Sequence, residues 1–455
     1  MPNTIVVGLQ WGDEGKAKIL DDLVQEAKQA NDKKIWVVRF QGGPNAGHTN
    51  YILMPDGRLV KFVSHAAPIG VTSNSEIGIG PNVAFDPEKF IKEVEEARKL
   101  FGYNAGIHIS ERTGILFDYH RKLDAWQESL RTGNLKIGTT VSGIGPFYMD
   151  NANRATRITF AEYVSDNFHD TLAKVLEQKS HELVAARIPG LVTGKYLDTL
   201  IATHDPIRKE LKECACELEY ILREALEKGE NIILEGAQGS MLDIDMGTKP
   251  TQTSSHLLAT DPLAGLGLPR SAFRIYGVEK LYPTRVGEGV MPTLAEDNFG
   301  IETQKNAGEV GASTGRDRRV GYPDWVIIKY TAMLNDIDGI YLTRVDNVQD
   351  RDIKVCTAYE VNGKRTERVP SKLETATPIY SDKIYSWHLW DGPADLSKPE
   401  EVDKALHDKR ADYVKEGSGS LPKSLKEYII DHENYIKKPI IGMSIGPARG
   451  EIVKL

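Results

Sequence analysis

Five short apolar segments, each followed directly by a glycine-rich or polar turn, constrain the fold more than any other feature of this sequence. They are TIVVGLQWG from Thr4, KIWVVRFQGG from Lys34, NIILEGAQG from Asn231, GIYLTRVD from Gly339 and KPIIGMSIGP from Lys438. Helical patterns separate some of them, and apolar strands that alternate with helices favour a mainly parallel sheet. Ligands bind such sheets beyond the carboxyl ends of the strands. We therefore expect the five turns to form one site.

The predicted fold is α/β, with a large, mainly parallel central sheet flanked by helices, as in P-loop NTPases, and a peripheral antiparallel lobe. Residues 1–350 are expected to form the core, with a helical cover at about 100–230. The clearest helix is predicted from Asp205, as N-cap, to Lys228, with Gly229 as its C-terminal cap. Alternating stretches, many charges and the segment EGSGSLP place the lobe at 351–437, and 438–455 return to the core.

Composition excludes several classes of function. The chain has 455 residues and a formal net charge of −8, which argues against a broad nucleic-acid footprint. No apolar run approaches the roughly 18 residues that span a membrane. Three cysteines fit a reducing compartment, and Cys214 and Cys216 diverge on the predicted helix, which disfavours a metal site. We expect a cytoplasmic enzyme that binds neither nucleic acid nor membranes.

The first turn, GLQWGDEGKAK, is typical of a phosphate-binding loop, because glycine N–H groups at a helix start and a lysine attract anions. It lacks the hydroxyl that usually follows the lysine, since Ala17 stands there. Two acids, Asp13 and Glu14, precede the lysine, Lys16. Acids beside phosphates indicate a metal or a proton transfer. A plain strand-to-helix turn with a surface lysine is the alternative.

Other turns carry side chains with matching chemistry. His48, in QGGPNAGHTN, can donate a proton to a ligand, or can be structural. Arg316, Arg318 and Arg319, in GASTGRDRR, suit anions. Asp346, in TRVD, can accept from the N1 and N2 donors of guanine, or can simply end a strand.

The ordered combination of turns is far more specific than any single one. QWGDEGK, QGGPNAGHT, IGTT..GIGP, EGAQG..LDID.GT.P...TSS, TRVGEG, STGR.RR and TRVD occur in this order from Thr4 to Gly450. The chain resembles the adenylosuccinate synthetase family. The resemblance implies a homodimeric ligase of purine biosynthesis that joins IMP to aspartate with GTP and Mg²⁺, through a 6-phosphoryl-IMP intermediate.

The resemblance also implies a role for each matching residue. Asp13 is the general base at N1 of IMP, His48 the general acid, and Lys16 and Gln238 complete the catalytic set, while Asp13 and the carbonyl of Gly47 hold Mg²⁺. Arg154 reaches the partner subunit's site, and Asp346 binds guanine beside Arg344, where the family usually has lysine.

The implied binding residues form three groups. For IMP they are Asp13, Glu14, Gly15, Lys16, Asn45, Ala46, Gly47, His48, Thr140, Arg154, Gln238, Thr253 and Arg316. For GTP they are Gly12, Asp13, Glu14, Gly15, Lys16, Ala17, Lys18, Gly47, His48, Thr49, Arg318, Arg344, Val345, Asp346, Ser444, Ile445 and Gly446. For the amino acid they are Gly311, Ala312, Ser313, Thr314, Gly315 and Arg316.

The sequence departs from the family pattern where aspartate should bind. Val141 and Ser142 replace a glycine and an arginine, and Asp317 stands where a cation is usual. These changes alter the local charge by about three units, which weakens attraction for two carboxylates. The alternatives are a paralogue that couples another amine or uses a modified purine nucleotide, such as a guanine one, and a GTP-binding pseudoenzyme or switch. Retention of Asp13, Lys16 and His48 argues against a pseudoenzyme, and the missing hydroxyl after Lys16 argues against a switch.

Overall fold

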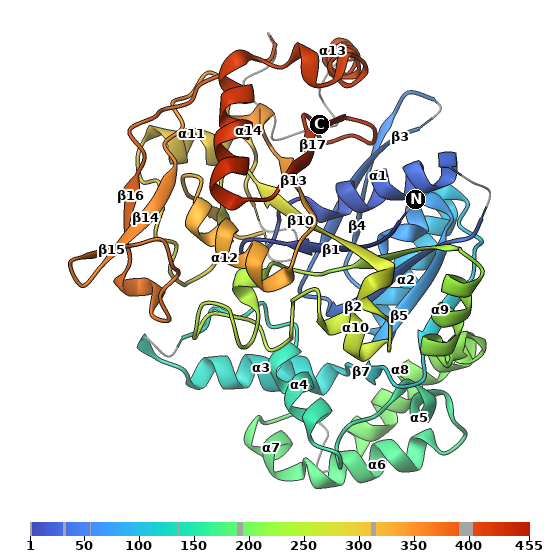
Figure 1. Ribbon diagram of the computed structural model, residues 1–455. Coiled ribbons are helices and arrows are strands. Elements are labelled where there is room, and N and C mark those ends of the chain that lie inside the picture. Colours follow the sequence, from blue (N-terminus) through green and yellow to red (C-terminus); the bar gives the residue numbers. More distant parts are fainter. Residues whose placement is uncertain are drawn as a thin grey trace.

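The structure is a computed structural model that describes residues 2–30, 33–54, 56–133, 136–188, 194–310, 315–390 and 404–455, without the side chains of 404 and 405. An eleven-stranded sheet forms its centre within these residues (Figure 1). The order across the sheet is β18 (Ile452–Lys454), β17 (Ile440–Ser444), β13 (Gly339–Thr343), β10 (Phe273–Lys280), β1 (Asn3–Gly8), β9 (Asn231–Glu235), β2 (Ile35–Gly42), β5 (Glu76–Phe85), β6 (Ile107–Ser110) and β8 (Ala215–Cys216), with β7 (Gly114–Ile115) beside β5.

Every pair in this sheet is parallel except β17 with β18, which confirms the predicted mainly parallel sheet. Side chains alternate between its two faces, as strand geometry requires. In β1, Ile5 and Val7 join one hydrophobic core and Val6 joins the other. Burial on both faces explains why the predicted strands are continuously apolar. The sequence analysis did not identify two central strands, β5 and β10.

Helices cover both faces of the sheet. Those of the described residues are α1 (Lys16–Ala30), α2 (Pro87–Phe101), α3 (Asp118–Leu130), α4 (Ile144–Ala152), α5 (Phe160–Val164), α6 (Phe168–Gln178), α7 (Ser180–Ala185), α8 (Lys195–Leu211), α9 (Leu218–Glu227), α10 (Asp261–Gly265), α11 (Asn298–Asn306), α12 (Trp325–Asn335), α13 (Lys404–Glu416) and α14 (Lys423–Ile436). Helices α1 and α2 pack on the face with Val6, and α9, α12 and α14 pack on the other. None of the described helices is both long and apolar enough to cross a membrane.

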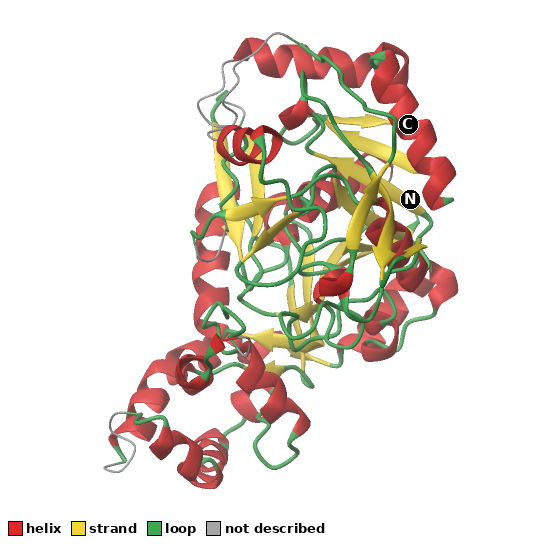
Figure 2. Ribbon diagram, turned by 90° about the vertical axis from the view of Figure 1, so that its left-hand side faces the viewer, coloured by secondary structure: helices red, strands yellow, loops and turns green. Residues whose placement is uncertain are grey.

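The helices between α3 and α8 do not simply lie over the sheet. They form a group that projects beyond its β5 side, at the bottom of Figures 1 and 2. Among the described helices of the predicted cover, 100–230, only α9 packs directly against the central strands on the face with Ile5, through Leu218 and Leu222.

The helix predicted from Asp205 to Lys228 is wrong in its extent. Helix α8 begins ten residues earlier, at Lys195, and includes Pro206, and the chain then forms the edge strand β8 before α9. The apolar stripe continues because α8 contributes Leu211 to one core and α9 contributes Leu218 to the other. Two helices that belong to different hydrophobic cores thus mimic one long amphipathic pattern. Gly229 does follow the end of α9 with a left-handed φ of 65°, as predicted.

Smaller antiparallel sheets flank the centre, in agreement with the predicted fold class. They are β3 (His48–Leu53) with β4 (Leu59–Ser64), β11 (Thr284–Val286) with β12 (Arg318–Val320), and β14 (Cys356–Val361) with β15 (Lys364–Thr366) and β16 (Thr377–Tyr380). The last sheet fills the first part of segment 351–437. The described end of that segment is helical, because α13 and α14 occupy it, and the EGSGSLP stretch turns between them.

Candidate functional site

The five predicted turns meet at one cavity of about 490 Å³, beyond the carboxyl ends of β1, β2, β9, β13 and β17. Most described residues of the predicted site line it. These are Gly12, Asp13, Gly15, Lys16, Ala17, Lys18, Asn45, Ala46, Gly47, His48, Thr49, Thr140, Gln238, Thr253, Arg316, Arg318, Arg344, Asp346, Ser444 and Gly446. Residues more than 400 positions apart in the sequence therefore contribute to one binding space.

The first loop turns one of its two acids inward, against the expectation that both face phosphates. Glu14 is fully buried and does not line the cavity. Its carboxylate accepts hydrogen bonds from the backbone N–H groups of Gln10 at 3.1 Å and Gly12 at 2.8 Å. Its other oxygen lies 2.5 Å from Nζ of Lys16. A Cβ atom at Gly239 would overlap the carboxylate, so this glycine is needed for the close approach. Glu14 therefore holds the loop in shape.

Asp13, by contrast, faces the cavity and is 29% exposed. Its Oδ2 atom lies 2.9 Å from Nε of Arg318. Arg318 also contacts Glu309 at 2.8 Å, and Glu309 contacts Lys280 at 2.7 Å and accepts a hydrogen bond from Tyr282 at 2.8 Å. Burial lowers the pKa of Lys280 to about 8, whereas Lys280 and the nearby arginines outweigh burial and hold the pKa of Glu309 far below its usual range. This ionic network fixes Arg318 beside Asp13.

His48 is buried and joined to a second carboxylate. Its Nδ1 atom lies 2.6 Å from Oε1 of Glu235, which ends β9, while Oε2 of Glu235 accepts a hydrogen bond from the N–H of Ile69 at 2.7 Å. Burial lowers the pKa of His48, and His48 and Arg39 outweigh burial to lower the pKa of Glu235. Nε2 of His48 has no hydrogen-bond partner among the described residues. The ring is thus oriented by one nitrogen, and the other remains available for chemistry.

Three polar side chains border the cavity from separate loops. Gln238 has a left-handed φ of 60° and is 9% exposed, and its Oε1 atom has no hydrogen-bond partner in the described part of the chain. Nη2 of Arg316 donates to the carbonyl of Gly138 at 3.1 Å, and the Thr140 hydroxyl donates to that of Ser142 at 2.9 Å. Donors and acceptors suited to a sugar phosphate or a purine edge therefore converge here.

The far end of the cavity is lined by Arg344, Asp346, Ser444 and Gly446. Lys18 lines it as well, but its ammonium donates to the Ser444 hydroxyl at 2.9 Å and to the carbonyl of Gly446. Burial lowers its pKa to about 8. Lys18 thus ties helix α1 to the loop after β17.

Four other described residues of the predicted site do not line the cavity. Val345 and Ile445 are fully buried in the hydrophobic core, so their side chains do not face the cavity. Gly315 is exposed, and Arg154 is exposed beyond the end of α4. The remaining amino-acid-binding positions, Gly311, Ala312, Ser313 and Thr314, lie outside the described residues.

The departures from the family pattern at the expected aspartate site also lie outside the cavity lining. Neither Ser142 nor the exposed Asp317 borders it. Val141 has a left-handed φ of 55°, a conformation that suits glycine and strains a β-branched residue. Position 141 therefore has the left-handed backbone conformation that glycine favours, although valine occupies it.

Sequence reasoning missed several charged residues of the site, among them Glu235, Arg285 and Arg410. Glu235 carries a detectable signal, because a carboxylate in an apolar strand requires a buried partner. Arg285 stacks on Trp11, with 5.6 Å from its guanidinium carbon to the ring centroid, and lines the cavity. Arg410 reaches the base end from α13, whose charged sequence gives no such indication.

Comparisons with known proteins agree with this site. The family model described as adenylosuccinate synthetase matches residues 5–453. The adenylosuccinate synthetase of Alkaliphilus metalliredigens is 34% identical over 100% of this chain and 99% of its own length. That of Pelotomaculum thermopropionicum is 37% identical over 85% of this chain and 88% of its own.

A solved structure, described as fully ligated adenylosuccinate synthetase from Plasmodium falciparum, superposes with a TM-score of 0.83 at 28% identity and covers 100% of both chains. The family model extends over almost the whole chain, including every turn that lines the cavity. This chain belongs to the adenylosuccinate synthetase family.

Proposed function

We propose that this chain joins IMP to L-aspartate with hydrolysis of GTP, forming adenylosuccinate, GDP and phosphate in the biosynthesis of AMP. The observation that carries the proposal is the arrangement within one cavity. A carboxylate (Asp13), an ammonium (Lys16) and an imidazole (His48) lie in the same space as a base-reading carboxylate (Asp346). These groups are what a phosphoryl transfer from a guanine nucleotide to a purine oxygen requires.

The chemical problem is the C6 oxygen of IMP, which is a poor leaving group. Removal of the N1 proton by Asp13 makes O6 nucleophilic, so that O6 can attack the γ-phosphorus of GTP. The bond from the γ-phosphorus to its bridging oxygen breaks, and GDP leaves. The aspartate amine then displaces phosphate from C6. Asp13 suits the first step because its carboxylate faces the cavity. The carboxylate of Glu14 is instead paired with Lys16 inside the loop.

His48 is proposed to stabilise the phosphoryl group in transfer. With its pKa lowered by burial, the free ring is neutral and Nδ1–H donates to Glu235. An adjacent phosphate anion favours the protonated ring, because opposite charges raise a histidine pKa. Nε2 then becomes a donor to the developing negative charge. Glu235 holds the ring in place and stabilises the cation.

The family implies Mg²⁺, and the residues present fit this ion. Mg²⁺ binds proteins through one or two carboxylates together with substrate phosphates. Asp13 offers one exposed carboxylate, and Gly47 borders the same cavity. No group of three acidic, histidine or cysteine side chains suited to a metal occurs in the described ranges, which agrees with a site completed by phosphates. Asp13 and the Gly47 carbonyl would hold the ion, which would neutralise phosphate charge.

The other substrates have matching positions. We propose that Asn45, Gln238, Thr253 and Arg316 bind IMP, together with Thr140. The loop 311–316 is proposed to bind aspartate. Because Ser142 and Asp317 lie outside the cavity lining, their altered charges do not require another amine.

We also propose that the protein acts as a homodimer in the cytoplasm. Arg154 is exposed and lies away from the cavity of its own chain, as expected for a residue that serves the partner's site. The three cysteines are free thiols, which fits a reducing compartment.

The proposal is tested by incubating the purified chain with GTP, IMP, Mg²⁺ and each of a panel of amino acids. Phosphate release and the absorbance change of the purine ring are measured together. We expect stoichiometric phosphate and product with aspartate alone. Product with another amine instead of aspartate would reject the substrate assignment, and no phosphate release in any combination would indicate a binding protein without activity.

A further inference from the structure

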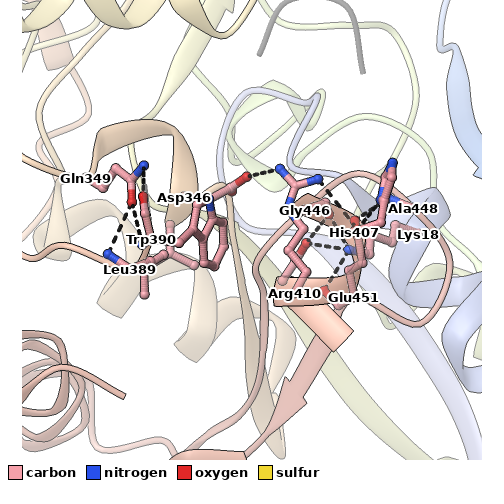
Figure 3. Close-up of polar contacts among 12 residues, drawn as sticks. Lys18, Asp346, Gln349, Leu389, Trp390, His407, Arg410, Gly446, Ala448 and Glu451 are labelled. Atoms are coloured by element: carbon pink, nitrogen blue, oxygen red, sulfur yellow. Dashed lines mark hydrogen bonds and ion pairs between the residues drawn. The ribbon is translucent and has the colours of Figure 1, made fainter. Parts of the chain in front are cut away.

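A buried arginine from outside the sheet lies at the base end of the cavity. Arg410 belongs to α13, yet it borders the same space as Asp346 and Gly446 (Figure 3). Its side chain is only 1% exposed. A guanidinium is among the groups most costly to bury, and it is retained in a protein interior when paired or bound.

The contacts of Arg410 leave much of its donor capacity unused. Nη2 lies 3.4 Å from Oδ2 of Asp346, and Nη1 lies 3.5 Å from Oε1 of Glu451. Both distances exceed the roughly 2.7–2.9 Å of strong charge-assisted hydrogen bonds. Nε has no hydrogen-bond partner within the described ranges. The guanidinium has five N–H donors, so several remain free for a ligand.

The surroundings hold this guanidinium in a fixed orientation. The ring of Trp390 lies beneath it, with its centroid 5.5 Å from the guanidinium carbon. Glu451 is itself held by His407 at 2.7 Å and by the N–H of Ala448 at 2.7 Å. A Cβ atom at Gly446 would lie 2.7 Å from Nε and Cδ of Arg410, so the glycine permits the arginine to pack flat on the loop. The group is preorganised rather than loosely placed.

Arg410 supplies hydrogen-bond donors, and the neighbouring carboxylate of Asp346 supplies two acceptor oxygens. Guanine presents the complementary edge, since its O6 acceptor adjoins the N1–H and N2–H donors. The carboxylate matches N1–H and N2–H, and the neighbouring guanidinium matches O6, as arginine does in recognising guanine O6 and N7. Adenine instead presents an amino donor at C6 and an acceptor at N1, so each charge would face a group of the wrong kind.

We propose that Arg410 is a specificity-determining residue that donates a hydrogen bond to O6 of the guanine base. The inference rests on the proposed use of GTP and extends it by naming a residue of α13 as part of the base pocket. The base is then recognised by two elements, the loop after β13 and helix α13.

The test compares GTP, ITP and ATP as phosphoryl donors for the wild type and for Arg410→Met, which keeps an unbranched apolar stem and removes all donors. GTP and ITP both carry O6, so kcat/KM for both should fall about 10–100-fold, mainly through KM, with a much smaller change for ATP. The GTP/ATP preference therefore shrinks by a similar factor. Asp346→Asn should instead weaken GTP more than ITP, because ITP lacks the N2 amine.

The controls separate recognition from folding and from the proposed function. Lys415→Met, at an exposed position of the same helix, should leave all three donors unchanged. If Arg410→Met unfolds, Arg410→Lys decides, because it keeps the charge and loses the planar donor pair. An unchanged GTP/ATP ratio in a folded Arg410 variant overturns this inference alone. A wild-type chain without activity on GTP, IMP and aspartate rejects the proposed function instead.

Discussion

Nδ1 of His48 lies 2.6 Å from Oε1 of Glu235, and both side chains are buried. Such a carboxylate fixes which imidazole nitrogen faces the substrate and favours the protonated ring. The pair therefore ties the end of β9 to the proposed phosphoryl-transfer chemistry.

Replacing Glu235 with glutamine tests this relationship. The amide keeps a hydrogen bond to Nδ1 but removes the negative charge that counteracts the burial-lowered pKa of His48. If protonated His48 is the active form, activity is lost as pH rises through the pKa of His48. Because the variant lowers this pKa, its activity should be lost at lower pH than in the wild type. We expect kcat to fall about 10–100-fold and the alkaline limb of the kcat–pH profile to shift to lower pH. Glu76→Gln is the matched control, since Glu76 pairs with His108 at 2.8 Å outside the cavity. An unshifted limb would contradict the role of Glu235.

Asp13→Asn tests the proposed base. Asparagine tolerates the left-handed φ of 60° at this position, so the loop should keep its shape. Without a proton acceptor at N1, phosphate release should fall by about 10²–10⁴-fold. Asp22→Asn, which alters an α1 carboxylate outside the cavity, should retain activity. Phosphate release near the wild-type rate would show that another group removes the proton.

The sequence predicted the central sheet and the gathering of its turns because both depend on local patterns. Continuous apolar runs followed by polar turns require strands buried on both faces, and parallel strands bring their ends together. The pattern could not assign the helix at 205–228, because the apolar positions of two helices in different hydrophobic cores share one spacing.

Side-chain direction was the other limit. Asp13 and Glu14 are adjacent acids, but only the packing of Gly239 against Glu14 shows which one turns inward. Lys18 was expected to bind GTP, but no sequence pattern indicated that its ammonium also donates to Ser444 in the loop after β17. Arg410 lies in a charged helix, and only tertiary structure brings it to Asp346.

Asp324 should make stability depend on pH. Its carboxylate accepts a hydrogen bond from Tyr359 at 2.6 Å and caps α12, and burial raises its pKa to about 7. The unfolded chain ionises this group near pH 4, so its favourable contribution is full below that pH and is lost as pH rises toward 7. Asp324→Asn keeps the cap without the titration. Urea unfolding of both forms at several pH values should show the variant gaining stability relative to the wild type between about pH 4 and 7. A constant difference would contradict the raised pKa.

Arg154→Ala tests whether the site is shared between subunits. Alone, the variant should bind IMP weakly and have little activity. Mixed after subunit exchange with Asp13→Asn, it should regain about one quarter of wild-type activity, because half of the dimers then hold one intact site. Lys16→Met mixed with Asp13→Asn is the control, since both residues line the cavity of one chain and no intact site can form. Absence of rescue in the first mixture alone would place Arg154 outside the partner's site.

Val141→Gly should stabilise the protein. Val141 has a φ of 55°, and a β-branched side chain there crowds the backbone. Relief of this strain exceeds the entropy that glycine loses on folding, so the free energy of unfolding should rise by about 1 kcal/mol.

Val184→Gly is the matched control, because Val184 is similarly exposed but lies in helix α7. That change should lower the free energy of unfolding by roughly 0.3–0.5 kcal/mol, the difference in helix propensity between glycine and valine. Chemical denaturation of both variants gives the two signs directly, and destabilisation by Val141→Gly would show that the turn relies on contacts of the valine side chain.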